Sequence, residues 1–170
     1  MKSGKEPVIC YISSFRNRDI DPVLERSGFC HGMVTFAIPS LGILFRCRAS
    51  GTRLDLEFGC FFSLLKFLKT SLKDEKITSI QVLSSDAEFV FAFTGNSRHL
   101  APGSERDRLL REYAKGLKIA VGYVEPYRNK TRVSPDDYPS IPADRQASLR
   151  PDPEDTKKAQ FKPFQRGIQL

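Results

Sequence analysis

The chain has 170 residues, of which 40% are hydrophobic, and it carries a formal net charge of +7. This length supports one domain with a single core. No apolar run approaches the roughly 20 residues that a bilayer-spanning helix needs. The first residues, MKSGKEPVICYISSF, lack the pattern of an export signal. We therefore expect a cytoplasmic protein with no membrane partner.

The positive charge is confined to the first part of the chain. Residues 134–170 carry six acidic and six basic residues, so the whole excess of +7 lies within residues 1–133. A basic folded domain beside a neutral tail permits contacts with a phosphate backbone. An ordinary basic, soluble surface accounts for the charge equally well.

The four cysteines do not form a recognisable framework. Cys10, Cys30, Cys47 and Cys60 are widely and irregularly spaced, and three of them lie within apolar runs. This is typical of reduced core cysteines in a cytosolic protein rather than of disulfides. The Cys30-His31 pair has no CxxC motif or second histidine cluster to complete a zinc site. We expect neither disulfides nor zinc.

The first third of the chain predicts three strands. Residues 7–15 (PVICYISSF) are rich in β-forming side chains. Residues 32–38 and 43–50 form a second and a third strand, joined by a turn that contains Pro39 and Gly42. We expect these two strands to pair as an antiparallel hairpin.

Residues 52–72 predict the clearest helix. Thr52 and Asp55 resemble a capping box at its start, with Asp in place of the usual Glu. Gly59 lowers the helix propensity by about 1 kcal/mol, which favours close packing at that position. An apolar stripe at three- and four-residue steps predicts a helix packed on a sheet; it comprises Leu54, Phe58, Phe61, Leu65, Leu68 and Leu72.

The next elements alternate between strand and helix. Ser85 and Ser104 are each expected to cap a helix. In chain order we expect a strand at 77–85, a short helix after Ser85, a helix over 105–118 and a last strand at 119–127. The order β-β-β-α-β-α-α-β predicts an α/β fold with a mixed five-stranded sheet and helices packed on it.

The composition changes after the last strand. Residues 134–170 are rich in proline and charge, so we expect an extended or partly disordered tail after a domain that spans residues 7–133. The FKPF segment of this tail is a candidate for docking onto a protein partner or a second copy. The candidate anchors are Phe161, Phe164, Ile168 and Leu170.

Two carboxylates stand out from this pattern. Glu57 lies on the apolar stripe, where an ionised group is costly unless it is paired, hydrogen-bonded or metal-bound. Periodicity alone favours its escape to solvent or a pairing with arginine. Asp86 follows a strand, where open α/β sheets place ligands, but acidic residues are also favoured in the first turn of a helix. Together the two carboxylates could share a divalent cation.

The order of elements and two motifs resemble the ribonuclease H family. EFGCFFSLLKFL, which begins at Glu57, is similar to the apolar helix that a Glu initiates in that family, and SSDAEFV around Asp86 is similar to its second aspartate motif. The hairpin at 32–51 precedes the helix in the expected place. The resemblance covers residues 7–128 and implies a ribonuclease H-like fold with a two-metal nuclease site.

The first strand departs from the family pattern. The family ends this strand with an Asp that ligates both metal ions, whereas Ser13 occupies that place here and the glycine-rich turn after it is missing. Two Mg²⁺ ions about 4 Å apart repel each other strongly and need several bridging anionic oxygens. A neutral hydroxyl is a poor substitute, so Glu57 and Asp86 are expected to give at most weak binding of one metal.

The last carboxylate of the family also has no clear counterpart. It normally follows an Asn by about four residues on a helix. Here Asn129 is followed by KTRVSPDDYP, so Asp136 and Asp137 arrive late, and the neighbouring prolines oppose a helix. The candidate catalytic set Glu57, Asp86, Asp136 and Asp137 is therefore degenerate.

Three functions remain open, because function transfers weakly from fold alone. The first is a non-catalytic ribonuclease H-like module that binds nucleic acid or a nucleoprotein partner. The second is a protein-interaction or scaffold module that uses the tail. The third is a metal-dependent nuclease with a relocated carboxylate. The candidate nucleic-acid contacts are Arg46, Arg48, Arg53, Arg98 and His99.

Other chemistries find little support in the sequence. The glycines form no phosphate-binding loop, and the two histidines, His31 and His99, have no partner motif for a nucleophile triad. We expect no cofactor, with Mg²⁺ or Mn²⁺ as the metal if the chain is an active nuclease.

Overall fold

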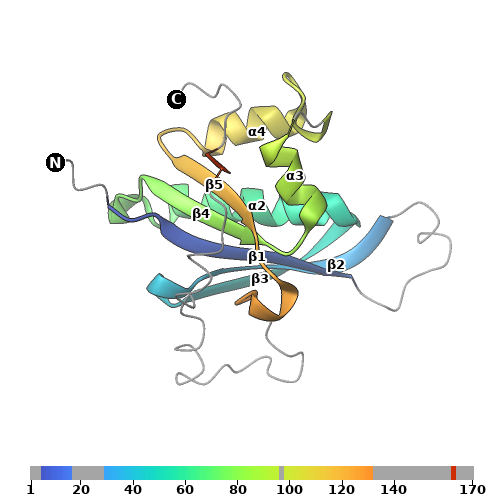
Figure 1. Cartoon of the computed structure of the whole chain (residues 1–170), viewed down its shortest axis with the longest axis horizontal. Helices are drawn as coiled ribbons and strands as arrows, with labels where there is room; N and C mark the ends of the chain where they lie inside the picture. Colours follow the sequence, from blue (N-terminus) through green and yellow to red (C-terminus); the bar gives the residue numbers. More distant parts are fainter. Residues whose placement is uncertain (1–4, 17–28, 96–97, 132–161, 164–170) are drawn as a thin grey trace.

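The elements follow the predicted order (Figure 1). The computed structural model describes residues 5–16, 29–95, 98–131 and 162–163. In chain order the elements are β1 (Val8–Arg16), β2 (Phe29–Ile38), β3 (Ile43–Thr52), α2 (Arg53–Thr70), β4 (Ser79–Ser84), α3 (Ala87–Thr94), α4 (Glu105–Tyr113), β5 (Lys118–Tyr123) and β6 (Lys162–Pro163).

The sheet is mixed, as the sequence predicts. Its strand order is β3-β2-β1-β4-β5-β6. The first three strands form an antiparallel meander, β1, β4 and β5 are parallel, and β6 pairs antiparallel with β5 over two residues. The short β6 adds to the five predicted strands. The rest of the predicted tail, including the domain boundary at 133/134, lies outside the described residues.

Strand β1 lies in the middle of the sheet and is apolar on both faces. Cys10 and Ile12 belong to the large core that α2 covers, whereas Tyr11 packs with Ala37, Leu83 and Val124 on the opposite face. Successive side chains of a strand point to opposite faces. Residues of one parity on β1 therefore face α2, and residues of the other parity face away from it.

Helix α2 closes the larger core. The predicted capping box is confirmed, because the Thr52 side chain accepts from Asp55 N and the Asp55 carboxylate accepts from Thr52 N. The buried face carries an aromatic cluster with helix α3, formed by Phe58, Phe61, Phe89 and Phe93. The expectation of close packing at Gly59 is wrong, because a Cβ there would meet no atom within 4 Å.

Helices α3 and α4 begin with side-chain caps. Ser104 caps α4 as expected, but the cap of α3 is Asp86 rather than Ser85. Helix α4 ends at Tyr113, before the predicted residue 118. The chain turns there, and Gly116 adopts a left-handed conformation with φ 78° that suits glycine.

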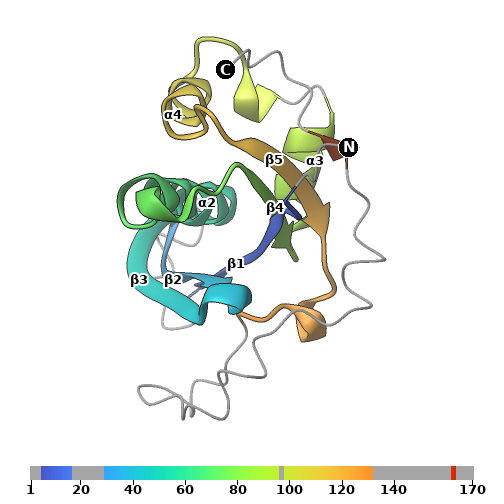
Figure 2. The ribbon, with the colours of Figure 1, turned by 90° about the vertical axis from the view of Figure 1, so that its left-hand side faces the viewer.

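The segment after β5 crosses to the face of the sheet opposite α2. Its 3-10 helix η4 (Pro126–Arg128) lies on one side of β1, whereas α2 lies on the other (Figures 1 and 2). Cys10, Cys47 and Cys60 are free thiols. Among the described residues, no helix is long and apolar enough to cross a membrane.

Candidate functional site

Glu57 is buried and hydrogen-bonded near the carboxyl ends of the central strands β1 and β4. It lies early in α2, and its residue is only 2% exposed. Ser84 Oγ donates to Glu57 Oε1 at 2.6 Å, and Ser14 Oγ donates to Glu57 Oε2 at 2.7 Å. The expected escape to solvent is therefore wrong, and serine hydroxyls rather than arginine hold this carboxylate.

Burial raises the pKa of the Glu57 carboxyl above its ordinary value. The hydroxyls of Ser84 and Ser14 lower the pKa in part, because they stabilise the charged form, whereas the neighbouring charge of Asp86 raises it further. Desolvation is the largest of these effects. Glu57 is thus a carboxyl group whose ionised form is disfavoured by its surroundings.

Asp86 is engaged as the cap of helix α3. Its Oδ1 accepts from the backbone N of Glu88 and of Phe89, and its Oδ2 lies 3.4 Å from Arg53 Nε. The backbone N of Asp86 donates to Ser84 Oγ at 3.0 Å. One hydroxyl, that of Ser84, therefore links the Glu57 carboxylate to the backbone of Asp86.

The serine beside Glu57 is Ser14, not Ser13. Ser14 has the parity of Ile12 on β1 and faces α2, whereas Ser13 has the parity of Tyr11 and faces the other way. The Ser13 hydroxyl lies 2.5 Å from Thr131 Oγ1. The expectation that Ser13 stands at the carboxylate site is wrong, because β1 presents Ser14 to Glu57 instead.

Asn129 and Thr131 fasten the segment after β5 to the sheet. Asn129 Nδ2 donates to the carbonyl O of Ile12 at 2.9 Å and to Ser85 Oγ at 3.1 Å. Thr131 Oγ1 lies 2.7 Å from Asn129 Oδ1. An amide oxygen only accepts, so Thr131 donates its proton to Asn129 and accepts the proton of Ser13. Both side chains are buried and have a structural role.

The described residues do not fit a two-metal site. Glu57 and Asp86 come close together, but no group of three or more His, Cys, Asp or Glu side chains in the described ranges could hold a metal ion. Each carboxylate already has partners of its own. The other two members of the predicted catalytic set, Asp136 and Asp137, lie outside the described residues.

The five predicted nucleic-acid contacts lie in three places. Arg46 and Arg48 lie on β3 with the parity of Leu44, which places them on the face opposite α2. Arg53 and His99 lie near the helices with Glu88, at 3.4 Å and 3.5 Å from its carboxylate. Arg98 is exposed in a short 3-10 turn before α4.

Sequence reasoning missed the hydroxyls that organise the site. Ser84 directly precedes the Ser85-Asp86 pair, and Ser14 directly follows Ser13, so only strand parity separates the functional serines from their neighbours. A buried carboxylate on a helix face and a serine at a strand end are together the signal that could have identified them. No local signal points to Asn129 or Thr131 as partners of β1.

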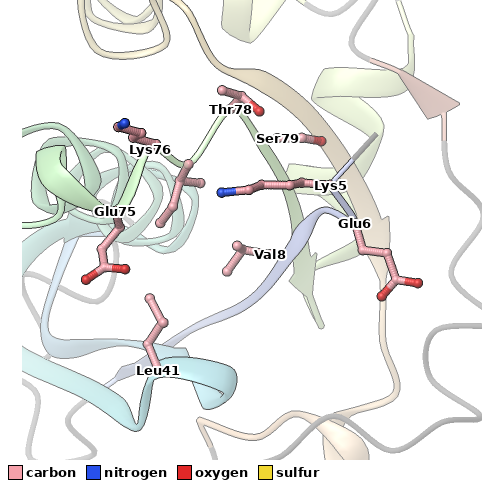
Figure 3. A pocket seen from close by; sticks show the side chains of 9 residues that line it. Lys5, Glu6, Val8, Leu41, Glu75, Lys76, Thr78 and Ser79 are labelled. Carbon is pink, nitrogen blue, oxygen red and sulfur yellow. The ribbon is translucent and has the colours of Figure 1, made fainter. Parts of the chain in front are cut away.

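A small pocket lies near the amino ends of the same two strands (Figure 3). Its volume is about 140 Å³, and it is lined where β1 and β4 begin by residues that include Lys5, Val8, Leu41 and Ile77. Glu57 lies near the other ends of these strands, beside Ser14 and Ser84. The pocket is therefore separate from the carboxylate site.

Comparison with known proteins identifies the fold. No protein-family model matches the sequence, and no curated protein matches it. The structure is similar to ribonuclease H1 from the halophilic archaeon Halobacterium salinarum, with 12% identity and a TM-score of 0.54 over 74% of this chain and 91% of that one. It is also similar to LC11-RNase H1 in complex with an RNA/DNA hybrid, with 13% identity and a TM-score of 0.50 over 71% and 87%. These similarities confirm a ribonuclease H-like fold.

Proposed function

We propose that this chain, whose fold is ribonuclease H-like, is a non-catalytic domain that binds nucleic acid. The observation that carries the proposal is the state of Glu57. Its two oxygens accept hydrogen bonds from Ser14 and Ser84, and burial raises its pKa. A carboxylate whose two oxygens are hydrogen-bonded in this way acts as a structural group rather than as a metal ligand.

The chemistry of two-metal hydrolysis supports this proposal. Two divalent ions need bridging anionic oxygens to offset their mutual repulsion. Ser14 contributes a neutral hydroxyl where such an oxygen is needed, and the carboxylate of Asp86 is engaged by two backbone N–H groups and Arg53. Any metal would have to displace these contacts, which also hold the start of α3.

Two observations support nucleic acid as the partner. The excess of +7 charges lies before residue 134, which favours a phosphate backbone. One protein with a similar fold has been solved with an RNA/DNA hybrid. We propose that this chain also binds nucleic acid, without cleaving it.

Binding and cleavage are tested separately. Labelled RNA/DNA hybrid, duplex DNA and single strands are titrated by fluorescence anisotropy at about 50 and 200 mM salt, with affinity expected to fall steeply with salt. The same substrates are then incubated with Mg²⁺ or Mn²⁺. Binding without cleavage supports the proposal, and absence of binding at low salt contradicts it.

A variant at Ser14 tests why the domain would be inactive. Ser14→Asp places a carboxylate beside Glu57 and Asp86, so we expect it to gain Mn²⁺ affinity by calorimetry, whereas the neutral Ser14→Asn control does not. Metal-dependent cleavage by the unmodified chain that is lost on Asp86→Asn would instead identify a nuclease with a relocated carboxylate.

The side of β5 that faces away from β4 supports a second candidate, a protein-interaction module. The tail residues Lys162–Pro163 pair with Val121 and Ala120 on β5 of the same chain, so this edge accepts an extended segment. Edge strands readily pair with further chains. Light scattering of the chain with and without residues 150–170 tests this candidate: an unchanged monomer in both cases argues against self-docking.

A further inference from the structure

The face of the sheet opposite α2 carries an ordered row of side chains. Phe15 on β1, Met33 on β2 and Arg48 on β3 are register partners across three neighbouring strands. All three have the parity of the face that Tyr11, Ala37 and Leu44 define. Phe15 is 37% exposed and Arg48 is also exposed. An aromatic ring and a guanidinium thus stand on one surface with a flexible apolar side chain between them.

The three strands that carry this row have charged side chains of a single sign. Strands β1, β2 and β3 (VICYISSFR, FCHGMVTFAI and ILFRCRASGT) contain no acidic residue, and their charged side chains are arginines. Arg46 lies on the same face as Arg48, two residues earlier on β3, and is the register partner of Thr35. A surface with arginine and no carboxylate on its own strands attracts a polyanion.

The basic residues near the helices have a different setting. Arg53 lies beside Asp86 and Glu88, His99 beside Glu88, and Arg106 forms an ion pair with Asp55. A phosphate at that surface would compete with these carboxylates and be repelled by them. The sheet face therefore complements a phosphate backbone better than the helix side does.

From this arrangement we infer that the row Phe15–Met33–Arg48 is a binding platform for single-stranded nucleic acid; this inference rests on the proposed function. The exposed ring of Phe15 stacks a base, and Arg48 contacts a phosphate of the same strand. A base in a duplex already stacks on its neighbours, so an aromatic platform on an open sheet selects unpaired bases. The platform lies on the opposite face of β1 from Glu57.

The chain offers a matched control for the stacking residue. Phe45 on β3 is also 37% exposed, but it stacks on Phe36 on the α2 side of the sheet. Phe15→Ala and Phe45→Ala therefore remove the same ring at the same exposure from opposite faces. Arg48→Gln removes the charge of an exposed side chain, and Arg108→Gln on α4 serves as its control.

The test measures affinity for single-stranded, duplex and hybrid oligonucleotides by fluorescence anisotropy, after circular dichroism has shown that each variant is folded. We expect single strands to bind most tightly and Phe15→Ala to weaken their binding about tenfold, whereas Phe45→Ala leaves it unchanged. Arg48→Gln is expected to reduce the salt slope for single strands by about 0.7. A 2-aminopurine base should lose fluorescence on binding, and Phe15→Ala should abolish that loss.

The outcomes separate this inference from the proposed function. Binding that prefers duplex or hybrid, or that is insensitive to both Phe15→Ala and Arg48→Gln, overturns the platform and leaves the proposed function standing. Absence of binding to every oligonucleotide at low salt overturns both. Should Phe15→Ala fail to fold, Arg48→Gln and the 2-aminopurine signal of the unmodified chain decide the matter.

Discussion

The two faces of strand β1 differ: one holds a buried polar network, and the other presents exposed side chains. On the α2 side, Ser14 and Ser84 hold the carboxylate of Glu57 in a buried network. On the other side, the adjacent residue Phe15 lies in a row with Arg48, on strands without acidic residues. One face of β1 thus holds a buried carboxylate as part of the internal structure, whereas the other presents an exposed ring and an exposed arginine.

The largest expected effect comes from a change that disturbs both sides at once. A Cβ on Gly32 would lie 2.1 Å from the carbonyl O of Phe15, so β1 or β2 must shift. We expect Gly32→Ala to cost about 3 kcal/mol of stability, at the upper end for overpacking, and also to weaken nucleic-acid binding. Urea denaturation measures the first effect. A loss below about 0.5 kcal/mol would show that the strands adjust freely.

Ser84→Ala disturbs only the buried network on the α2 side of β1. Ser84 is fully buried, and its hydroxyl donates to Glu57 and accepts from the backbone N of Asp86. Its loss leaves a buried carboxylate short of a donor, which we expect to cost about 2 kcal/mol. Ser14→Ala is the control: its site is partly exposed, so water replaces the hydroxyl and the cost is expected to be about 1 kcal/mol or less. Equal losses in urea denaturation would contradict the ranking.

The pH dependence of stability tests the buried carboxyl group on the α2 side of β1. The pKa of Glu57 is raised in the folded state, so its favourable contribution is present below the ordinary value of 4.5 and is lost as the pH rises through the folded-state pKa. Glu57→Gln removes this titration and keeps both serine contacts, since its amide can donate to Ser14 and accept from Ser84. We expect the variant to gain stability relative to the unmodified chain as the pH rises above 4.5, the ordinary pKa of the group. A constant difference across that range would argue against a raised pKa.

The smallest expected effect is a stabilisation away from both faces. Gly59 lies inside α2, where a Cβ would meet nothing within 4 Å. Gly59→Ala should therefore add about 0.5–1 kcal/mol through helix propensity without changing nucleic-acid binding. Thermal unfolding measures it, and a lower melting temperature would mean that the helix packs more tightly there than the geometry indicates.

The sequence predicts the fold well because its signals are local. The stripe on α2, the Thr52–Asp55 capping box and the hairpin turn at Pro39 and Gly42 each depend on residues a few positions apart. Short-range periodicity and capping chemistry determine such elements directly. The one misplaced cap, at Ser85 instead of Asp86, is an error of a single residue between two good capping types.

The candidate site is harder to predict, because it depends on strand parity. A central strand such as β1 is apolar on both faces, so the alternation that normally identifies the inward residues is missing. Cys10, Tyr11 and Ile12 are all fully buried, and nothing in the sequence decides whether Ser13 or Ser14 faces α2. The aspartates at 136 and 137 remain a prediction, since they lie outside the described residues.

The links from β1 to the segment after β5 bear on how the domain is completed during synthesis. The carbonyl of Ile12 and the hydroxyl of Ser13 meet their partners in Asn129 and Thr131, 117 and 118 positions further along the chain. β1 leaves the ribosome before the other strands of the sheet, yet these bonds form only after the segment that follows β5 has emerged. In a nascent chain halted at the end of β5, the carbonyl of Ile12 and the hydroxyl of Ser13 on this central strand therefore lack these hydrogen bonds.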